Sequence, residues 1–506
     1  MAAASNGGDG VLAASRHMRY FQRCFRTMLP RQYMGNDSTR MTLGFFIIAA
    51  MDLLTPTPTA AAGDPSPPPK PDAPLTSEDR RRVRDWVLAA QHPHGGFCGS
   101  PTHALPAHEY DGWDFEAAAP APGSPGSANV AATAFALLLL ALVADPAAPE
   151  SAFAGVRRAA TLRWLRGLQR PDGSFGEVLV DMPAGPGATR THKTIAGGRD
   201  MRYCYIASMI RWILRGDLKQ DDPGWVEDID VEALARYIRQ AQTFDGGVGE
   251  SSMHESHAGY AYCAISGLSL LERPLEGRGS VSHCGMHVDS LLRFLASRQI
   301  AYQDPAADEA DGDPDEENFP QLSALSREAV AGPCPEHVGL NGRCNKVADT
   351  CYTWWVAGTL DSLRRLPGGG ADVDIAREPA RRFLMDKTQH LIGGFSKHPG
   401  GPPDVYHSYL GLAVLATMGE PGLKEFDESL CVSSQTVTSI EAGRRGLLKQ
   451  CCGGDKASRD QVVRLGELMA GCEADTLVGK GAGMEAAEGG QLLEQLLSRR
   501  MQMTKA

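Results

Sequence analysis

The sequence predicts an all-α fold, in which helix pairs repeat to form an α/α barrel (toroid) or a related solenoid. Two observations lead to this prediction. First, a helical stretch that ends at Gln and is followed by a Gly-rich turn recurs along the chain, and an apolar stretch rich in Ala and Leu follows each turn, often after an insert. Second, the alternation of apolar and polar residues that is typical of β-strands is nearly absent.

The repeats can be followed in chain order. The clear copies of the Gln–Gly motif are WVLAAQHPHGGF (86–97), WLRGLQRPDGSF (164–175), YIRQAQTFDGGVGE (237–250) and FLMDKTQHLIGGF (383–395). A degenerate copy, FLASRQIAYQD, occupies residues 294–304. The apolar partner stretches include NVAATAFALLLLALV (129–143), GYAYCAISGLSLLE (259–272) and YHSYLGLAVLATM (406–418). Paired helices that repeat around Gly turns are typical of barrels and solenoids.

We expect a barrel domain over residues 1–435 and a largely disordered C-terminal tail over 436–506, where the repeat pattern stops. Three low-complexity inserts interrupt the barrel: a Pro-rich segment at about 55–75, a loop of small residues at 182–198 and an acidic segment at about 304–320. Pro-rich segments are extended or disordered, and acidic runs are solvated and mobile. The tail contains only weak helical patterns, and we assign it no function.

The composition indicates a globular protein, since 42% of the 506 residues are hydrophobic and 22% are charged. A formal net charge of −11 argues against nonspecific binding to nucleic acid. The twelve cysteines are scattered without a CxxC pair, which is typical of reduced thiols. The N-terminus lacks signal-peptide order, and the longest apolar run (41–54) is too short to span a bilayer. We therefore expect a cytoplasmic protein that is not an integral membrane protein.

Asp349, Cys351 and His407 form a possible zinc site. Residues two apart do not share a helix face, so Asp349 and Cys351 can bind one ion only where the backbone is irregular, before a helix that Thr350 could cap. His407 lies in the first turn of another expected helix, which Asp404 could cap. Carboxylate, thiolate and imidazole suit Zn²⁺ and leave a fourth position open. The alternative is chance, because twelve cysteines and fourteen histidines allow many such sets.

Arg343 and Lys346 precede the possible zinc ligands in the same loop. The following helix directs its N-terminal N–H groups towards that loop, so the two cations predict a site for an anionic group, most naturally phosphate. The alternative is that both are solvated surface charges. A zinc ion beside a phosphate site, in a barrel with aromatic and Ala-rich helices, suggests a metal-bound nucleophile that attacks an apolar diphosphate.

At this point the motifs resemble a known family. GRCNKVADTCYTWW, ESHAGYAYCAISGL, DMRYCY, PDVYHSYLGL and the Gln–Gly repeats are similar to the β subunits of protein prenyltransferases, over residues 19–434 apart from the inserts. The family fold is an α/α barrel with a central funnel. The resemblance implies that zinc activates a cysteine near the C-terminus of a protein substrate, which then receives an isoprenoid. It also implies a heterodimer with an α subunit of helical hairpins.

The resemblance also assigns roles to individual residues. The zinc ligands of the family match Asp349, Cys351 and His407, and its diphosphate-binding residues match His257, Arg343, Lys346 and Tyr352. An arginine near the carboxylate of the peptide substrate matches Arg202. The aromatic residues that line the isoprenoid site match Tyr205, Tyr260 and Trp355, with Cys263 beside them. The family motif SHGG reads SHAG at 256–259, a change that adds one methyl group.

Three positions imply a type I geranylgeranyltransferase. Thr42 and Phe46 fall where farnesyltransferases carry tryptophans, and a threonine leaves room for a fourth isoprene unit. Lys397 falls where farnesyltransferases use an aspartate that holds Mg²⁺, so an ammonium group would neutralise the diphosphate and Mg²⁺ would not be required. The segment YFQRCFRTMLPRQY (20–33) also looks like the start of type I β subunits.

The implied substrates are geranylgeranyl diphosphate and CaaX-type proteins that end in Leu, such as Rho-type small GTPases. Tyr406 departs from the type I pattern, since type I enzymes tend to an aliphatic residue there and farnesyltransferases to an aromatic one. This position lies near the terminal residue of the peptide, so the preference for Leu is less secure than the choice of lipid.

Other functions remain as alternatives. A farnesyltransferase β subunit is opposed by Thr42, Phe46 and Lys397, and a Rab-type β subunit is normally shorter and lacks the type I start. A triterpene cyclase would need a DxDD or DCTA motif, and the sequence contains neither. A noncatalytic helical scaffold would bind partners through the inserts, and it predicts neither zinc nor lipid binding.

Overall fold

The computed structural model describes residues 10–55, 74–100, 127–183, 191–277, 285–303, 335–365 and 373–452. The chain divides into two units, Met1–Cys452 and Gly453–Ala506, and every described residue belongs to the first. The predicted inserts at 55–75 and 304–320 fall almost entirely outside the described residues, as does the tail from residue 453. None of the described helices combines the length and the apolar character that crossing a bilayer requires.

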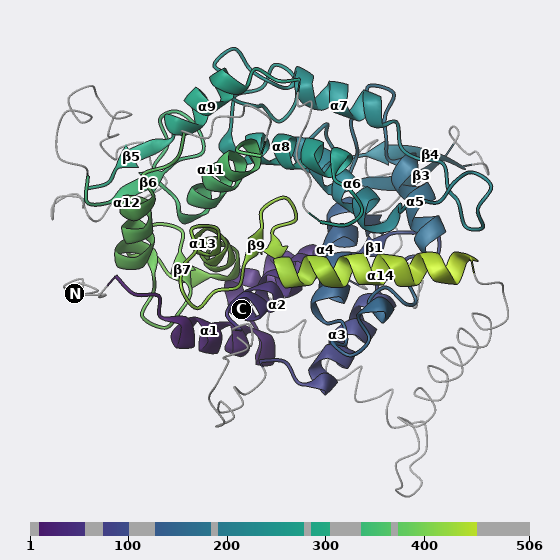
Figure 1. Ribbon diagram of the computed structural model, residues 1–506, viewed down its shortest axis with the longest axis horizontal. Helices are drawn as coiled ribbons and strands as arrows, with labels where there is room; N and C mark the ends of the chain where they lie inside the picture. The colour runs from purple at the N-terminus through teal and green to yellow at the C-terminus, as the bar shows by residue number, and fades with distance from the viewer. Residues whose placement is uncertain are drawn as a thin grey trace, which may run out of the picture. The chain divides into compact units, whose positions relative to one another are not determined.

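Six helices form an inner ring in the described part of the first unit (Figure 1). They are α2 (Arg40–Leu53), α4 (Val130–Leu142), α6 (Met201–Leu214), α8 (Ala258–Glu272), α11 (Thr350–Leu363) and α13 (Val405–Thr417). Each helix contacts the next, and α13 contacts α2, so the ring is closed. Helix α4 carries no charged residue, which is typical of a helix that is buried on all sides. The prediction of an all-α barrel is confirmed.

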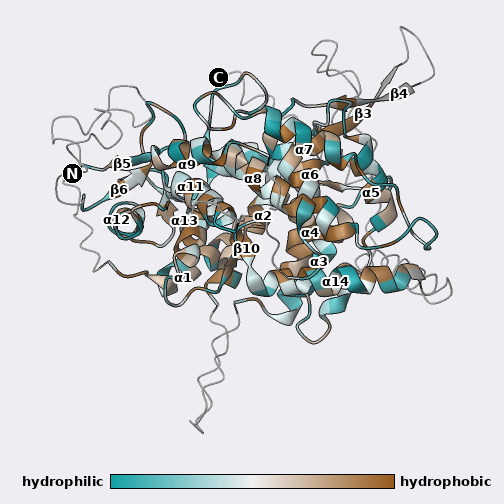
Figure 2. Ribbon diagram, turned by 45° about the horizontal axis from the view of Figure 1, so that its top comes forward, coloured by the Kyte–Doolittle hydropathy of each residue, from teal (hydrophilic) through white to brown (hydrophobic). Residues whose placement is uncertain are grey.

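A second set of helices packs around this ring. It consists of α1 (Ala14–Arg26), α3 (Ser77–Ala89), α5 (Arg158–Gly167), α7 (Val231–Gln240), α9 (Val288–Ala296), and α12 (Arg377–Arg382) with η3 (Phe383–Thr388). The first five of these contact α2, α4, α6, α8 and α11 in turn. Outer helices such as α7 are amphipathic, with Leu234 and Ile238 buried on one face. Figure 2 accordingly shows apolar residues on the inner ring and hydrophilic ones on the outer faces.

The predicted Gln–Gly motif is one recurring closed turn. In each clear copy the Gln pairs through its backbone with the residue six positions later, as Gln169 does with Phe175. A glycine with positive φ closes the turn, and a Cβ atom there would lie 2.1 to 2.3 Å from the backbone of the next outer helix. The four glycines are Gly95, Gly173, Gly246 and Gly393. Only glycine fits such a position, because both the conformation and the space exclude a side chain.

The Gln side chains join neighbouring repeats. Gln169 accepts a hydrogen bond from the N–H of Asp230 (2.7 Å) and donates to its carbonyl (2.8 Å), at the N-cap of α7. In the last copy, Gln389 accepts from the N–H of Ala13 (2.8 Å), which is the N-cap of α1. His17 also contacts Gln389, with 2.9 Å between Nε2 and Oε1. The last turn therefore holds the first outer helix and closes the outer set.

Short strands lie between the helices, and one hairpin contradicts the prediction of a loop at 182–198. Strands β1 (Phe97–Cys98), β2 (Ala128–Asn129), β3 (Val178–Pro183) and β4 (Thr191–Ala196) form one antiparallel sheet in that order. The other strands pair two by two: β5 (Gln299–Ala301) with β6 (Val338–Leu340), β7 (Phe395–Ser396) with β8 (Pro403–Asp404), and β9 (Phe426–Asp427) with β10 (Val432–Ser433). The loop expected at 182–198 thus contains strand β4, because Val178, Val180 and Ala196 bury one face of the β3–β4 hairpin.

Helix α14 (Ser434–Cys452) extends the unit beyond the boundary predicted at residue 435. It contacts α4, α6 and η2 (Pro149–Ser151). Its Arg444 is buried and donates to the carbonyl of Trp212 at 2.8 Å. Gly443 and Gly446 let the helix approach η2 closely, since a Cβ on Gly446 would lie 2.0 Å from the carbonyl oxygen of Glu150. The same glycines weaken the helical pattern in the sequence, which is why the barrel domain was predicted to end at residue 435, before this helix.

Candidate metal and anion site

The N-termini of α8, α11 and α13 are tied together at one end of the inner ring. The N–H of Ala258 donates to the carbonyl of Gly342 (2.8 Å), and the N–H of Thr350 donates to that of Lys397 (3.0 Å). Each helix is capped by its own side chain, namely His257, Asp349 or Asp404. Thr350, the predicted cap of α11, instead donates its hydroxyl to the carbonyl of Ser396. Asp349 is the cap because its carboxylate accepts from the N–H of Cys351 at 2.7 Å.

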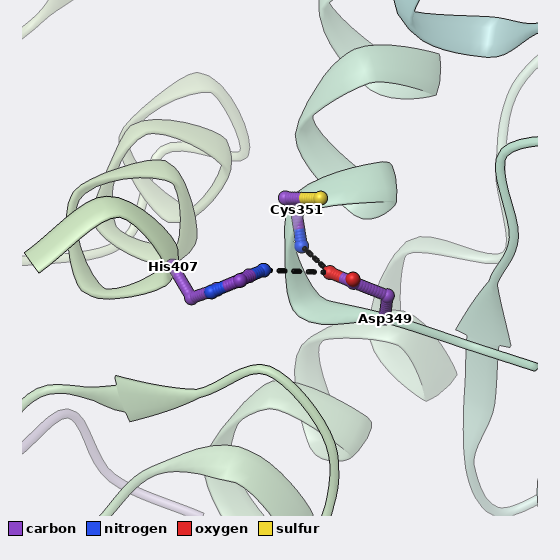
Figure 3. Close-up of side chains that lie close together, drawn as sticks. All are labelled: Asp349, Cys351 and His407. Atoms are coloured by element: carbon purple, nitrogen blue, oxygen red, sulfur yellow. Dashed lines mark hydrogen bonds and ion pairs between the residues drawn. The ribbon is translucent and has the colours of Figure 1, made fainter. Parts of the chain in front are cut away.

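Asp349, Cys351 and His407 lie together, as the sequence predicted. One ligand atom from each lies within 4.8 Å of the others, and Nε2 of His407 is 3.3 Å from Oδ1 of Asp349. Figure 3 shows the imidazole of α13 pointing at the carboxylate that begins α11, with the thiol beside it. Asp349 and Cys351 are buried, at 4% and 5% exposure. The donor set fits a tetrahedral Zn²⁺ with one position open.

Asp404 orients the histidine of this cluster. Its Oδ2 atom lies 2.6 Å from Nδ1 of His407, while its Oδ1 accepts from the backbone N–H groups of Tyr406 and His407 (2.9 Å each). A proton held on Nδ1 leaves the Nε2 lone pair for an ion, as in carboxylate–histidine–zinc arrangements. Sequence reasoning assigned Asp404 only the capping role. The spacing of three residues within one helical turn was the available signal for the second role.

The electrostatics of the cluster favour a cation. Burial lowers the pKa of His407, but hydrogen bonds to Asp349 and Asp404 outweigh it and raise that pKa to about 9. Burial raises the pKa of Asp349, but the bond to His407 holds it below its ordinary value. Burial and the Asp349 charge raise the pKa of the Cys351 thiol well above its ordinary value. A metal ion would reverse the last effect, because it stabilises the thiolate directly.

His257 and Tyr352 form a hydrogen-bonded pair beside the cluster. His257 Nδ1 accepts from the N–H of Gly259 (3.0 Å), so Nε2 of the neutral ring carries the proton and donates to the Tyr352 hydroxyl oxygen (3.1 Å). Burial, followed by the charge of Arg343, lowers the pKa of His257 to about 4, so the ring is neutral at pH 7. The Tyr352 hydroxyl proton then remains for another acceptor, such as an anionic ligand.

The cations predicted for an anion lie around the start of α11. Arg343 forms an ion pair with Glu255 at 2.6 Å, and both side chains are partly exposed. Lys346 is exposed, and its carbonyl accepts from the buried side chain of Asn341 at 2.8 Å, which holds the loop. The backbone of Lys397 lies beside the start of α11, because its carbonyl accepts a hydrogen bond from the N–H of Thr350. Sequence reasoning missed Glu255, which precedes the family motif by one residue.

Four of the residues predicted for the lipid and the peptide, Phe46, Tyr205, Trp355 and Tyr406, lie in two aromatic groups. Tyr262, which sequence reasoning missed, joins Tyr205 and Trp355, with ring centroids 5.5 and 5.0 Å apart. Phe46 meets Tyr406 edge-on at 5.5 Å. The other predicted residues are placed as follows: Thr42 one turn before Phe46 on α2, Tyr260 against His257 (5.2 Å), Cys263 buried in α8, and Arg202 paired with its N-cap Asp200 and largely exposed.

Comparison with known proteins identifies the family. The pattern of the prenyltransferase alpha-alpha toroid domain matches residues 12–432. The chain belongs to this family. The predictions of a prenyltransferase and of its toroidal fold are therefore confirmed.

Several relatives carry more specific names. The geranylgeranyl transferase type-1 subunit beta of Arabidopsis thaliana is 28% identical over 420 residues, which cover 81% of this chain and 85% of the relative. That of Dictyostelium discoideum is 25% identical and covers 82% and 94%. The protein farnesyltransferase subunit beta of Pyricularia oryzae is 24% identical and covers 79% and 62%. The Arabidopsis thaliana and Dictyostelium discoideum relatives confirm the resemblance to type I β subunits of this prenyltransferase family.

The fold also matches a solved structure, that of Candida albicans protein geranylgeranyltransferase-I complexed with GGPP. The TM-score is 0.59 at 23% identity, and the match covers 86% of this chain and 99% of the other. The arrangement of inner and outer helices is therefore that of the toroid family.

Proposed function

We propose that this chain is the zinc-dependent β subunit of a type I protein geranylgeranyltransferase. It would transfer geranylgeranyl from geranylgeranyl diphosphate to the cysteine of a C-terminal CaaX motif, preferably one ending in Leu, on proteins such as Rho-type small GTPases. An α subunit would complete the enzyme. The observation that carries the proposal is the cluster of the buried Asp349 and Cys351 with the half-buried His407, beside a loop that bears Arg343 and Lys346.

The metal ligands and the capped helices would prepare the nucleophile. Zn²⁺, when bound, would take the substrate thiol in its open position and lower its pKa, so that thiolate is available at neutral pH. Asp349 and Cys351 carry the two negative charges of the site, and their rigid placement at the start of α11 fixes where that position opens. Asp404 holds His407 so that Nε2 faces the same point.

The cations around α11 would stabilise the leaving diphosphate, on which charge grows as the bond to C1 of the lipid breaks. Arg343, Lys346 and Lys397 supply positive charge, and the neutral His257–Tyr352 pair supplies a hydroxyl donor. Donors placed for a developing anion are worth roughly 2.7–4 kcal/mol each when one is removed. The positive end of the α11 helix dipole adds to this field.

Three positions support geranylgeranyl over farnesyl as the lipid. Thr42 and Phe46 lie one turn apart on α2, and each takes less space than a tryptophan in the same place. Lys397 beside the start of α11 supplies the charge for which a Mg²⁺ site would otherwise be needed. A farnesyltransferase β subunit is the second candidate, favoured by the aromatic Tyr406 and by the Pyricularia oryzae relative.

The deciding experiment uses this chain purified with an α subunit, in assays of farnesyl and geranylgeranyl transfer to peptides ending in Leu or Ser, with and without Mg²⁺. We expect geranylgeranyl transfer to the Leu peptide without Mg²⁺, and one zinc per heterodimer. Efficient farnesylation that requires Mg²⁺ would favour the farnesyltransferase candidate. A purified complex with neither zinc nor transfer would leave a noncatalytic scaffold as the remaining function.

A further inference from the structure

Two side chains of α4 face the inside of the ring, and sequence reasoning assigned neither a role. Ala131 and Phe135 are partly exposed, while the other residues of this helix are buried. They are four positions apart and so share one face of the helix. Helix α4 packs against α2, α3, α6 and α14, so the uncovered face is the one that looks into the ring. On α11, Tyr352 and Trp355 are partly exposed among buried neighbours in the same way.

A series of aromatic contacts connects Phe135 with the candidate metal site. Phe135 contacts Phe46 of α2, with ring centroids 6.0 Å apart. Phe46 contacts Tyr406 of α13 at 5.5 Å, and Tyr406 contacts the ring of the metal-ligand candidate His407 at 4.9 Å. The uncovered face of α4 therefore belongs to the same inner surface as the metal cluster.

The space inside the ring is closed below the second turn of the inner helices. The loop 428–431, between β9 and β10, lies inside the ring (Figure 1). Its carbonyls accept hydrogen bonds of 2.5 to 2.9 Å from the hydroxyls of Tyr205, Tyr262 and Tyr409, which lie in the second turns of α6, α8 and α13. Buried hydroxyls need such acceptors, so the contacts hold the loop in place. An apolar chain that enters this space therefore extends across the ring rather than along it.

Helix α4 lies opposite α11, where the candidate anion site begins. In the ring order α2, α4, α6, α8, α11, α13, three steps separate these two helices in either direction. The axes of packed helices are about 8–10 Å apart, which puts opposite axes of a six-membered ring about 16–20 Å apart. A lipid whose diphosphate binds at the start of α11 and which crosses the ring would therefore end at α4.

At that end, two small residues lie above two aromatic ones. The starts of α2 and α4 are tied together, since the first turn of α2 donates a backbone hydrogen bond to the carbonyl of Gly99 (3.2 Å). Gly99 directly follows strand β1, which pairs with β2 just before α4. Thr42 and Ala131, in the first turns, therefore lie at a similar depth. Phe46 and Phe135, one turn further along each helix, contact one another beneath them.

We propose that Phe135 is the end wall of the lipid site and sets the longest isoprenoid that this chain accepts, with the last isoprene unit lying against Thr42 and Ala131. This inference rests on the proposed function and adds to it an upper limit on the length of the lipid. A further unit would have to displace packed aromatic side chains, which costs free energy in a closely packed interior. Thr42 leaves space for a fourth unit, and Phe135 excludes a fifth.

The test uses the heterodimer of this chain with an α subunit and the diphosphates of farnesol, geranylgeraniol and geranylfarnesol, which contain three, four and five isoprene units. Pairs of lipids compete for the peptide that the parent enzyme modifies best, so the product ratio gives the ratio of their kcat/KM values. Phe135→Ala should raise the ratio of five-unit to four-unit transfer by about tenfold or more, the usual discrimination of a hydrophobic pocket.

A second variant changes the same end of the site in the opposite sense. Ala131→Phe fills the space above Phe135, so the ratio of three-unit to four-unit transfer should rise by about tenfold or more. This variant keeps the test available if Phe135→Ala does not fold. Leu139→Ala is the matched control, because Leu139 lies one turn after Phe135 on α4 and is fully buried. It also loses a large apolar side chain from α4 but should keep the parent ratios.

Three results would overturn the inference. The first is an unchanged five-unit to four-unit ratio in Phe135→Ala, including equal losses with every lipid. The second is an unchanged three-unit to four-unit ratio in Ala131→Phe, which would show that the last unit does not reach α4. The third is a shift in Leu139→Ala equal to that in Phe135→Ala. A parent heterodimer that transfers no geranylgeranyl fails before any substitution is made, so failure of the proposed function is recognised separately.

Discussion

The closed turns and the interrupted repeat after α9 show two uses of one motif. After α3, α5, α7 and η3, the Gln pairs with the residue six positions later, and a positive-φ glycine closes the turn. After α9, Gln299 instead begins strand β5, which pairs with β6 on the far side of residues 304–334. No glycine occurs between Gln299 and residue 303, so the chain leaves the repeat at this point.

The interrupted repeat keeps the contact that builds the barrel. Gln299 accepts a hydrogen bond from the N–H of Ala376 at 2.6 Å, the N-cap of α12, just as Gln242 accepts from the N–H of His287 at the N-cap of α9. The link between neighbouring outer helices therefore does not need the glycine turn. The turn can be opened without breaking the outer set.

The interrupted repeat provides the backbone on which the candidate site is built. Strand β6 leads directly into the loop that carries Arg343 and Lys346 and ends at Asp349. That loop is held at both ends, since the backbone N–H of Asn341 donates to the carbonyl of Arg298 and the backbone N–H of Asp349 donates to that of Leu340, each at 3.0 Å. The closed turns hold the scaffold together, and the single interrupted repeat supplies irregular backbone for chemistry, as functional loops on rigid folds generally do.

The largest effect should come from the end of the opened loop. Asp349→Asn keeps a side-chain oxygen that can cap α11 but removes the charge that the metal needs. We expect metal content to fall from one ion to near zero, and transfer to fall by about a thousandfold, or about 4 kcal/mol. The midpoint of thermal unfolding in the presence of chelator should stay within a few degrees of the parent. Full metal content in this variant would remove Asp349 from the ligand set.

The closed turns should respond in the opposite way, with loss of stability rather than of chemistry. In Gly173→Ala, the new Cβ would lie 2.1 Å from the Ala233 carbonyl oxygen at φ +93°, so the free energy of unfolding should fall by about 3 kcal/mol. Gly422→Ala is the control, since Gly422 has φ +87° but no atom within 4 Å of the added Cβ, and about 1 kcal/mol is expected. Urea unfolding measures both. Equal losses would show that the close approach to α7 is unimportant.

The difference between the closed turns and the opened loop explains which features of the fold and the site could be predicted from the sequence. The closed turns depend on Gln and Gly within six residues, so the repeat pattern was visible and led to the barrel. The metal ligands were found because the opened loop keeps the order of a family motif. The ion pair between Glu255 and Arg343 joins residues that are 88 positions apart, and no local pattern encodes it. Helix α14 was missed because the glycines that let it pack also weaken its helical signal.

A pH effect of intermediate size is expected where the last closed turn meets α1. His17 accepts from the N–H of Gly394 at 2.9 Å and donates to Gln389, and burial lowers its pKa to about 4 from an ordinary value of 6.5. Between these values the unfolded chain binds a proton that the folded protein does not, so stability falls as the pH is lowered from 6.5 towards 4. We expect a loss of about 2 kcal/mol by pH 5.

His17→Asn provides the comparison for this pH effect, because an amide can accept from Gly394 but does not titrate. The difference in unfolding free energy between pH 7 and pH 5 should be smaller in the variant by about 2 kcal/mol. Urea midpoints at the two pH values measure it. An identical pH dependence in both proteins would mean that His17 is protonated in the folded state or already neutral in the unfolded one.

The smallest effect should come from Glu255, which pairs with Arg343 at 2.6 Å on the rim of the opened loop. Both side chains are partly exposed, at 56% and 42%, so the pair adds less than about 1 kcal/mol to stability. A diphosphate must displace this carboxylate to reach the guanidinium. Glu255→Gln should therefore leave the unfolding midpoint unchanged and tighten the binding of inorganic diphosphate by about two- to fivefold at low salt. The gain should shrink as salt is added, because exposed charges are screened.

Asp172→Asn is the control, since Asp172 forms a similar exposed pair with Arg199 at 2.7 Å outside the opened loop. Tighter binding in both variants would indicate a general loss of negative charge, and weaker binding in Glu255→Gln would mean that Glu255 positions Arg343 for the anion.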